Sequence, residues 1–176
     1  MLINVTKVKS TAQYSERLKL AEPVNAADYG YPELELVDNL QFQGVIENAA
    51  PFLELHGQAI AKLQQTCSRC LANFEQEFIV EIAEAFTNKQ EALSPDDAYE
   101  VAFFNGDEID IAPALLRSLL LELPMRPLCR PDCQGLCPNC GADLNQQPCS
   151  CKHEDIDIRL SKLQALFKTM NNDKEV

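Results

Sequence analysis

The sequence predicts an α+β protein, in which an antiparallel β-sheet or partly closed β-barrel carries a leucine-rich helix, a cysteine-rich module and a C-terminal helix. Apolar and polar residues alternate at period two between residues 53 and 86, as in half-buried strands. Leucines recur at helical spacing between residues 115 and 123. Six cysteines and four prolines then follow within residues 127–151. A β-rich body therefore precedes the helix, and a segment of different composition follows it.

The N-terminal part contains less regular segments ahead of the clear strands. Residues 2–8 are rich in Val, Ile and Thr, which predicts a strand. Residues 21–36 contain two prolines and a glycine, which predicts a long, partly irregular connection. Residues 41–47 predict the next strand.

Two longer strands are predicted at residues 53–64 and 74–86. Each has one apolar face, made of Leu53, Leu55, Gly57, Ala59, Ala61 and Leu63 in the first and of Phe74, Phe78, Val80, Ile82 and Phe86 in the second. The short connection between them contains Cys67 and Cys70. We therefore expect this cysteine pair at the tip of a hairpin.

The leucine-rich helix is introduced by several turn signals. Residues 89–97 predict an acidic loop, residues 99–104 a short strand, and Asn105-Gly106 a tight turn. Asp110 is the predicted N-cap, and Pro124 ends the helix. The leucines at helical spacing are Leu115, Leu116, Leu119, Leu120 and Leu123. We expect them to pack against the sheet as core.

Composition divides the chain after Pro124. We expect residues 1–124 to form an acidic β-rich body with one helix. Residues 125–176 are predicted to form the cysteine-rich module and the C-terminal helix, packed on the body as one structural unit. The module is too short to bury enough apolar surface to order itself without a staple. The apolar positions of the C-terminal helix are Ile156, Leu160, Leu163, Phe167 and Met170.

The predicted compartment decides how the eight cysteines are interpreted. The chain has no run of about 18 apolar residues that could span a membrane, and residues 1–10 lack an apolar signal region. We therefore expect a cytoplasmic protein, or a protein of the chloroplast stroma if the source has plastids. Disulfides do not persist in a reducing compartment, so cysteine pairs predict metal binding or redox chemistry.

The net charge of −12 is unevenly spread. Residues 1–124 hold 8 Lys/Arg against 20 Asp/Glu, which gives −12, whereas residues 125–170 hold 6 against 5, which gives +1. The acidic part would repel a phosphate backbone. Any direct contact with RNA is therefore expected in the final third.

The cysteine spacing predicts structural zinc sites. Zinc prefers four tetrahedral ligands and binds thiolates well at closed sites, and eight cysteines suffice for two such sites. Two short Cys-x-x-Cys pairs can each wrap a tight turn around a metal, and Gly141 suits the turn of the second pair. The predicted ligands are Cys67, Cys70, Cys129, Cys133, Cys137, Cys140, Cys149 and Cys151.

The preferred assignment puts the last four of these cysteines in one site and the first four in another. An alternative has a single site in the C-terminal cluster, with Cys67 and Cys70 idle or redox-active. His153 is a further candidate that could replace a cysteine. A metal count separates the two assignments, because two zincs per chain support the first and one zinc excludes it.

Neither thiol catalysis nor zinc catalysis fits the pattern well. A redox Cys-x-x-Cys needs a helix N-terminus in a βαβ setting, whereas Cys67 and Cys70 lie between β-like stretches. A catalytic zinc keeps an open position and usually has His or carboxylate ligands, but the only histidines are His56 and His153. We predict no enzyme, no catalytic residue and no small-molecule substrate.

Three motifs, in this order, resemble the YceD family of bacterial and chloroplast proteins. The first is Cys67-Ser-Arg-Cys70-Leu71 followed by an aromatic, and the second is residues 106–110 leading into the leucine-rich helix. The third starts at Pro127-Leu-Cys129, continues through Cys133-Gln-Gly-Leu-Cys137-Pro-Asn-Cys140-Gly141 and closes at Cys149-Ser-Cys151. The resemblance covers roughly residues 40–167.

The resemblance implies a non-enzymatic role in the accumulation of large-subunit ribosomal RNA during ribosome assembly, and metal binding by the cysteines. Its implied partners are ribosomal or assembly proteins, large-subunit rRNA precursor, or both. The acidic body predicts that a basic protein docks first. Candidate RNA contacts are Arg126, Arg130, Lys152, Arg159, Lys162 and Lys168. Two alternatives stay open: a zinc-stabilised interaction module unrelated to ribosomes, and a thiol-based redox or zinc sensor.

Overall fold

The computed structural model describes residues 1–89 and 101–151. The chain forms two compact units, residues 1–131 and residues 132–176. The predicted C-terminal helix, His153, most of the acidic loop at 89–97 and four of the six candidate RNA contacts lie outside the described residues. The predicted boundary after residue 124 stays a prediction.

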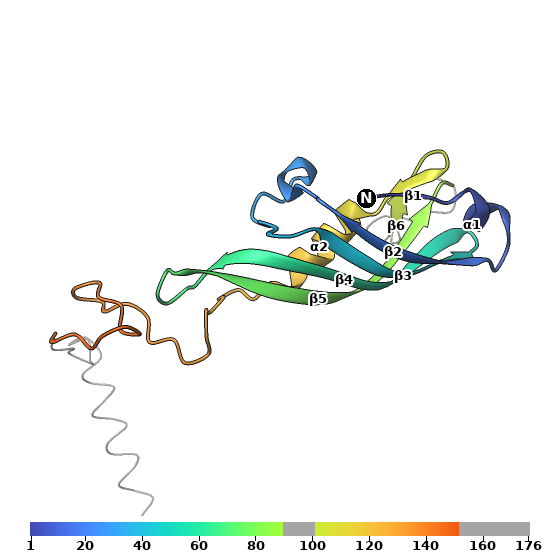
Figure 1. Cartoon of the computed structure of the whole chain (residues 1–176). Coiled ribbons are helices and arrows are strands. Elements are labelled where there is room, and N and C mark those ends of the chain that lie inside the picture. The colour runs from blue at the N-terminus through green and yellow to red at the C-terminus, as the bar shows by residue number, and fades with distance from the viewer. Residues whose placement is uncertain (90–100, 152–176) are drawn as a thin grey trace, which may run out of the picture. The chain divides into compact units, whose positions relative to one another are not determined.

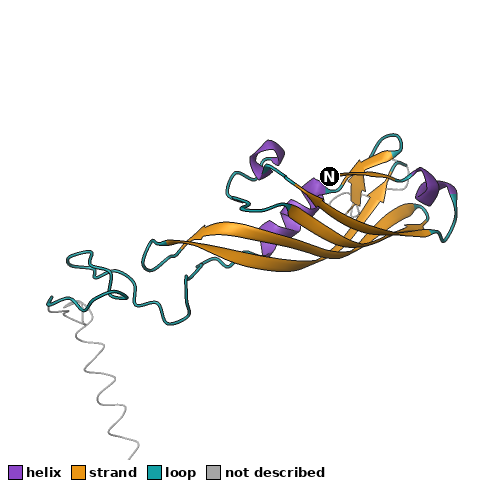
Figure 2. Cartoon of the chain, viewed as in Figure 1, coloured by secondary structure: helices purple, strands orange, loops and turns teal. Residues whose placement is uncertain are grey.

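The first unit is built around a curled five-stranded sheet (Figures 1 and 2). Its strand order is β2-β3-β4-β5-β6, with antiparallel neighbours except for the parallel pair β5 and β6. The strands are β2 (Ser15–Glu22), β3 (Leu40–Ala49), β4 (Phe52–Thr66), β5 (Asn73–Thr87) and β6 (Val101–Phe103). The predicted α+β class is confirmed, and the sheet is mixed because β6 pairs in parallel with the end of β5.

One face of the sheet forms the core, as the alternating residues require. Leu55, Ala59 and Leu63 of β4 are fully buried, whereas Glu75, Glu77 and Glu81 of β5 are exposed. Helix α2 (Ala112–Glu122) packs on the buried face, and three of its leucines have no exposed surface: Leu115, Leu116 and Leu119. The predicted packing of the leucine-rich helix is therefore confirmed.

Two facing glycines set how closely β3 and β4 approach one another. Gly44 and Gly57 are direct partners in the antiparallel register. A Cβ on Gly57 would lie 2.6 Å from the Cα of Gly44 and would also collide with the carbonyl oxygen of Gln43. Only a residue without a side chain fits here, because the obstacle is backbone on the neighbouring strand.

Asp110 organises the start of α2, although not quite as predicted. It belongs to β7 (Glu108–Asp110), which pairs with β1 (Leu2–Asn4), and the N-cap position is Ile111. Its carboxylate nevertheless accepts the Ala112 N–H at 3.1 Å and the Tyr29 hydroxyl at 3.0 Å. Burial and this carboxylate raise the pKa of Tyr29.

Two N-terminal predictions were wrong in part. The strand predicted at residues 2–8 ends at Asn4, and Thr6–Ser10 forms helix α1, in which Val8 is buried. The irregular connection predicted at 21–36 begins later, because β2 extends through Glu22, and it contains a 3-10 turn at Ala26–Tyr29. Strand β2 itself was not predicted. No helix among residues 1–89 and 101–151 has the length and apolar character of a membrane span.

Replacing Gly57 with Ala should lower the free energy of unfolding by about 2–4 kcal/mol, because the new methyl group must push β3 and β4 apart. Gly106→Ala is the matched control, since Gly106 has φ +79° but nothing within 4 Å of an added Cβ. We expect the control substitution to lower the free energy of unfolding by about 1 kcal/mol, because of the left-handed backbone alone. Urea unfolding measures both variants, and equal losses would contradict the packing argument.

Candidate metal centres

The hairpin of β4 and β5 ends in a tight cysteine turn, residues 67–72, called here the first knuckle. The Cys67 N–H donates to the Ala72 carbonyl at 2.9 Å, and the Leu71 N–H donates to the Cys67 carbonyl at 3.0 Å. The Ser68 N–H donates to the carbonyl of Pro127 at 2.8 Å. The predicted hairpin position of this cysteine pair is confirmed, and the segment after α2 is hydrogen-bonded to it.

Residues 137–142 of the second unit form a second knuckle with the same backbone pattern. The Cys137 N–H donates to the Ala142 carbonyl at 2.8 Å, and the Gly141 N–H donates to the Cys137 carbonyl at 2.8 Å. Both bonds have the same sequence offsets as in the first knuckle. Two segments far apart in the chain therefore form the same hydrogen-bonded turn around a Cys-x-x-Cys pair.

The residue after the second cysteine of each knuckle has a left-handed backbone. Gly141 has φ +73°, as its residue type allows, whereas Leu71 takes φ +59° in the first knuckle. A left-handed conformation costs a residue with a side chain roughly 1–2 kcal/mol. The side chain of Leu71 recovers little of this by burial, because 65% of it is exposed. The first knuckle thus maintains a strained residue that sequence inspection alone would not have flagged.

The structure brings together Cys67, Cys70, Cys129 and Cys133, called the first cysteine group. Their sulfur atoms all lie within 4.8 Å of one another. Three of the four side chains are buried, and Cys129 is half-buried. The sulfurs of Cys70 and Cys129 are 3.7 Å apart. Four ligands around a tetrahedral zinc at about 2.3 Å place sulfurs about 3.8 Å apart, so this spacing fits a metal better than a disulfide of about 2.05 Å.

The second cysteine group consists of Cys137, Cys140, Cys149 and Cys151, again with all sulfurs within 4.8 Å. It is more accessible than the first group. Cys137 is buried, Cys149 and Cys151 are half-buried, and Cys140 is exposed. The eight cysteines therefore fall into the two sets of four that the preferred assignment expects.

Polar side chains support the loop that leads from Cys133 to the second knuckle. The Asn145 carboxamide accepts the Gln134 N–H at 2.8 Å and donates to the Cys133 sulfur at 3.5 Å. It also donates to the carboxylate of Asp143 at 2.7 Å. Sequence reasoning missed this role, because an Asn–Asp pair separated by one residue is common in ordinary turns.

Backbone amides make two of the thiols unusually acidic. The N–H groups of Cys129 and Cys70 lower the pKa of Cys67 to about 6. In the second group, the N–H of Cys140 lowers the pKa of Cys137 to about 6. Hydrogen bonding with the Cys140 thiol and burial instead raise the pKa of Cys151 to about 12. Each knuckle thus holds one cysteine ready as a thiolate, the form that binds metal.

A third cluster of candidate ligands lies on the sheet surface and has a simpler explanation. Glu47, Glu54 and His56 have ligand atoms within 4.8 Å of one another. They sit on the exposed face of β3 and β4, and His56 lies 3.2 Å from Glu54 as an ordinary surface pair. The two cysteine groups differ from this surface cluster, because most of their members are buried or half-buried and amide N–H groups face the sulfur atoms.

Curled sheet, leucine-rich helix and two four-cysteine groups together define a β-rich protein with two candidate structural metal centres. The family model described as large ribosomal RNA subunit accumulation protein YceD matches residues 55–167. The chain belongs to this family. The resemblance inferred from the motifs is thereby confirmed, although the match begins at residue 55 rather than near residue 40.

Individual relatives show how much of the chain is similar to known proteins. An uncharacterized protein of Mycobacterium tuberculosis is 34% identical over 119 residues, which cover 67% of this chain and 57% of the relative. The maize protein named large ribosomal RNA subunit accumulation protein YCED homolog 1, chloroplastic, is 40% identical over 62 residues, which cover 35% of this chain and 21% of the relative. The uncharacterized protein YlbN of Bacillus subtilis is 31% identical over 104 residues, which cover 58% of this chain and 59% of the relative.

The chain thus spans little more than half the length of the mycobacterial relatives that it matches. No solved structure shows a significant match to it.

Exchanging the left-handed residues of the two knuckles should shift stability in opposite directions. We expect Leu71→Gly to raise the free energy of unfolding of the metal-loaded protein by about 0.5–1 kcal/mol, because a strained side chain is removed. Gly141→Leu should lower the affinity of the second group for Co²⁺ about fivefold or more, because the strain is introduced there. Thermal unfolding and Co²⁺ absorption titration check the two changes. A loss of stability in Leu71→Gly would show that the exposed leucine has a packing role.

Proposed function

We propose that this protein is a non-enzymatic, zinc-binding factor for the accumulation of large-subunit ribosomal RNA during ribosome assembly. The family match over residues 55–167 carries this proposal, together with the maize and Arabidopsis thaliana relatives named for rRNA accumulation. In this proposal the protein works in the cytoplasm, or in the stroma of a plastid-bearing source. It binds its partners without catalysing a reaction.

Zinc is the proposed metal for both cysteine groups. Four thiolates at tetrahedral spacing select zinc or iron among biological cations, and the closed, all-sulfur ligand set matches a structural zinc site. Loaded sites would lock the knuckles and the loops between them. All eight cysteines serve as ligands in this proposal, with no open position for a water molecule.

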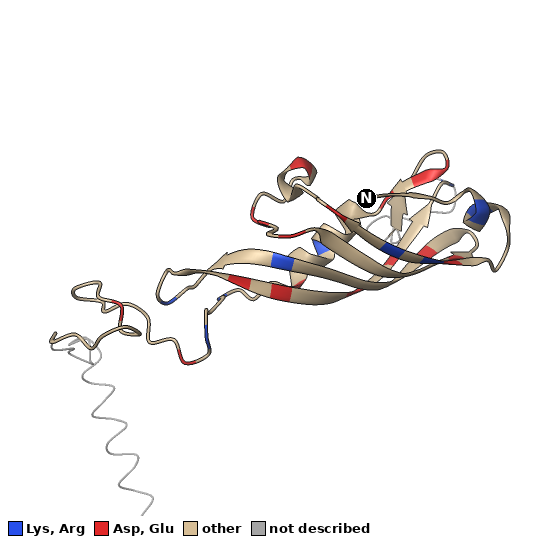
Figure 3. Cartoon of the chain, in the orientation of Figure 1, with Lys and Arg blue, Asp and Glu red and all other residues tan. Residues whose placement is uncertain are grey.

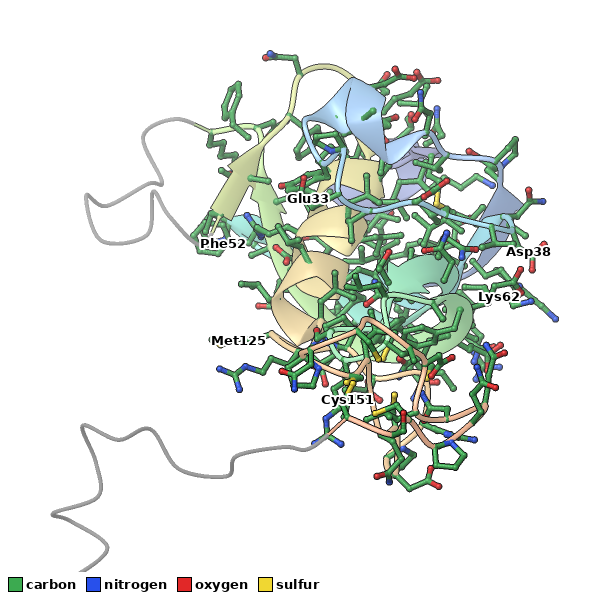
Figure 4. The ribbon with its side chains drawn as sticks, turned by 90° about the vertical axis from the view of Figure 1, so that its left-hand side faces the viewer. Glu33, Asp38, Phe52, Lys62, Met125 and Cys151 are labelled. Carbon is green, nitrogen blue, oxygen red and sulfur yellow. The ribbon has the colours of Figure 1, made fainter. Side chains whose placement is uncertain are left out.

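The acidic sheet is the proposed docking surface for a basic ribosomal or assembly protein. Glu75, Glu77 and Glu81 lie along the exposed face of β5, the strand that leads away from the first knuckle (Figure 3). Such a column of carboxylates raises the on-rate of a cationic partner and repels nucleic acid. Lys62, on the neighbouring strand (Figure 4), pairs with Glu75. Glu81 accepts a hydrogen bond from the Gln58 side-chain amide at 2.7 Å.

Purified protein should contain two zinc ions per chain, and the second group should lose its metal first. A chelator reaches the second group more easily, because Cys140 is exposed whereas Cys67, Cys70 and Cys133 are buried. Cys70→Ser and Cys140→Ser form a matched pair, each removing the second cysteine of one knuckle. Native mass spectrometry should count one zinc in each variant, and the zinc left in Cys70→Ser should be the more easily chelated. One zinc in the wild-type protein would exclude the two-site assignment.

Deleting the gene should lower the level of mature large-subunit rRNA relative to small-subunit rRNA by about twofold or more. The expected cause is that unassembled precursor is degraded when a factor that stabilises it is missing. Sucrose-gradient profiles and rRNA quantification check this result, with the wild-type gene restored as control. Unchanged rRNA levels and unchanged subunit profiles would contradict the proposed function.

A further inference from the structure

Two segments of the first unit meet at the hairpin tip, although they are far apart in sequence. The first knuckle is joined to the chain after α2 by the 2.8 Å bond from the Ser68 N–H to the Pro127 carbonyl. The sulfurs of Cys70 and Cys129 lie 3.7 Å apart. These two interactions place residues 66–72 against residues 124–131.

Every charged side chain in these two segments is an arginine. Arg69 lies between Ser68 and Cys70, while Arg126 and Arg130 directly adjoin Pro127 and Cys129. Each arginine is therefore the immediate neighbour of a residue that joins the two segments. All three are exposed, and we call them the arginine patch. The patch stands out because residues 1–124 carry a net charge of −12.

The three guanidinium groups contribute +3 beside the first cysteine group. A loaded site of four thiolates and one zinc dication sums to −2, and Asp132, next to Cys133, adds −1, so the arginines offset the negative charge around the site. Arginine also presents a planar fork that binds phosphate oxygens with two hydrogen bonds and can stack on bases. No lysine occurs in either segment, so the chemistry available is specifically that of arginine.

Apolar side chains flank the patch without being covered. Met125, directly before Arg126, is fully exposed at the end of α2 (Figure 4), and Leu71 is 65% exposed two residues after Arg69. Exposed apolar surface beside cations suits unpaired bases, which stack on side chains while their phosphates are neutralised. An acidic protein partner would need the cations but would not explain this combination as well.

We propose that Arg69, Arg126 and Arg130 form a binding site for the phosphate backbone of single-stranded or loop RNA. This inference rests on the proposed function, because it names the part of the protein that binds the ribosomal RNA. The site depends on the first knuckle, since the interactions of the knuckle join the segment that carries Arg69 to the segment that carries Arg126 and Arg130.

The test measures RNA affinity of the full-length, zinc-loaded protein by fluorescence anisotropy. The probe is a labelled transcript of a large-subunit rRNA segment with unpaired loops. The patch variant is Arg69→Gln, Arg126→Gln and Arg130→Gln combined. The control variant removes the same charge from the sheet surface, as Arg17→Gln, Lys19→Gln and Lys62→Gln. Zinc content and thermal unfolding are measured for both.

We expect the patch variant to bind RNA at least tenfold more weakly than the wild-type protein. The slope of log affinity against log salt should become shallower by roughly 0.7–0.9 for each phosphate group that the variant no longer neutralises. The control variant should keep the wild-type affinity within about twofold. The proposal is overturned if the patch variant binds RNA as tightly as the wild type, or if the control variant loses as much RNA affinity. It is also overturned if the only change in the patch variant is a loss of zinc or of binding to a protein partner.

Complementation separates this inference from the proposed function. If deletion lowers large-subunit rRNA and the patch variant restores it fully, the arginine patch is not the RNA site but the proposed function stands. If deletion changes nothing, the proposed function fails whatever the affinity in solution. Failure of the patch variant to restore rRNA, with wild-type zinc content, supports both.

Discussion

Residues 125–151 have little apolar burial to order them, and their buried positions are mostly cysteines. Among residues 125–151 the buried positions are Cys133, Gly135 and Cys137, and no aliphatic side chain in this stretch is fully buried. Fixing a residue's backbone costs about 1–2 kcal/mol in conformational entropy, which such a segment cannot recover from hydrophobic packing. Sulfur–metal bonds contribute directly to folding free energy in structural zinc sites, so the proposed metal centres would supply a stabilisation of comparable size. The knuckle hydrogen bonds and the Asn145 network then determine which geometry the thiols adopt.

The first knuckle is supported by the paired strands β4 and β5. Strands β4 and β5 are 15 residues long each, and they extend beyond the last residue of β4 that pairs with β3, which is Ile60. The projecting part is supported on its other side by the segment around Leu36, which forms an isolated bridge with Leu63. Leu63 is fully buried there. Hydrophobic burial thus stabilises the hairpin almost to its tip, where Cys67 and Cys70 lie.

The sequence predicts most strongly where one physical signal dominates. The period-two pattern located β4 and β5 within one or two residues, and the cysteine spacing predicted both groups of four. Strand β2 was not predicted because its residues alternate only between exposed and half-buried, as its position at the sheet edge requires. Residues 2–8 are rich in Val, Ile and Thr, yet Thr6–Ser10 forms a short helix that buries Val8 against the core. Tertiary packing overrode local propensity there. Asn145 and the strained Leu71 could not be found from sequence, because their roles arise only from interactions within folded loops.

The glutamates of β5 and the arginines near the first knuckle lie on neighbouring segments of the first unit. Glu75, Glu77 and Glu81 of β5 are exposed, whereas the charges in residues 66–72 and 124–131 are arginines, followed by Asp132. Figure 3 shows the acidic positions along the strand. Strand β5 begins directly after the first knuckle, and Glu75 lies only three residues beyond Ala72, about 10 Å along the strand. This separation is close to the Debye length of about 8 Å at physiological salt, so a charged partner at the hairpin tip also senses the first glutamates of β5. In the functions proposed above, the arginines would contact phosphate and the more distant Glu81 would contact a basic protein. The two proposed contacts would then lie on different surfaces of the first unit.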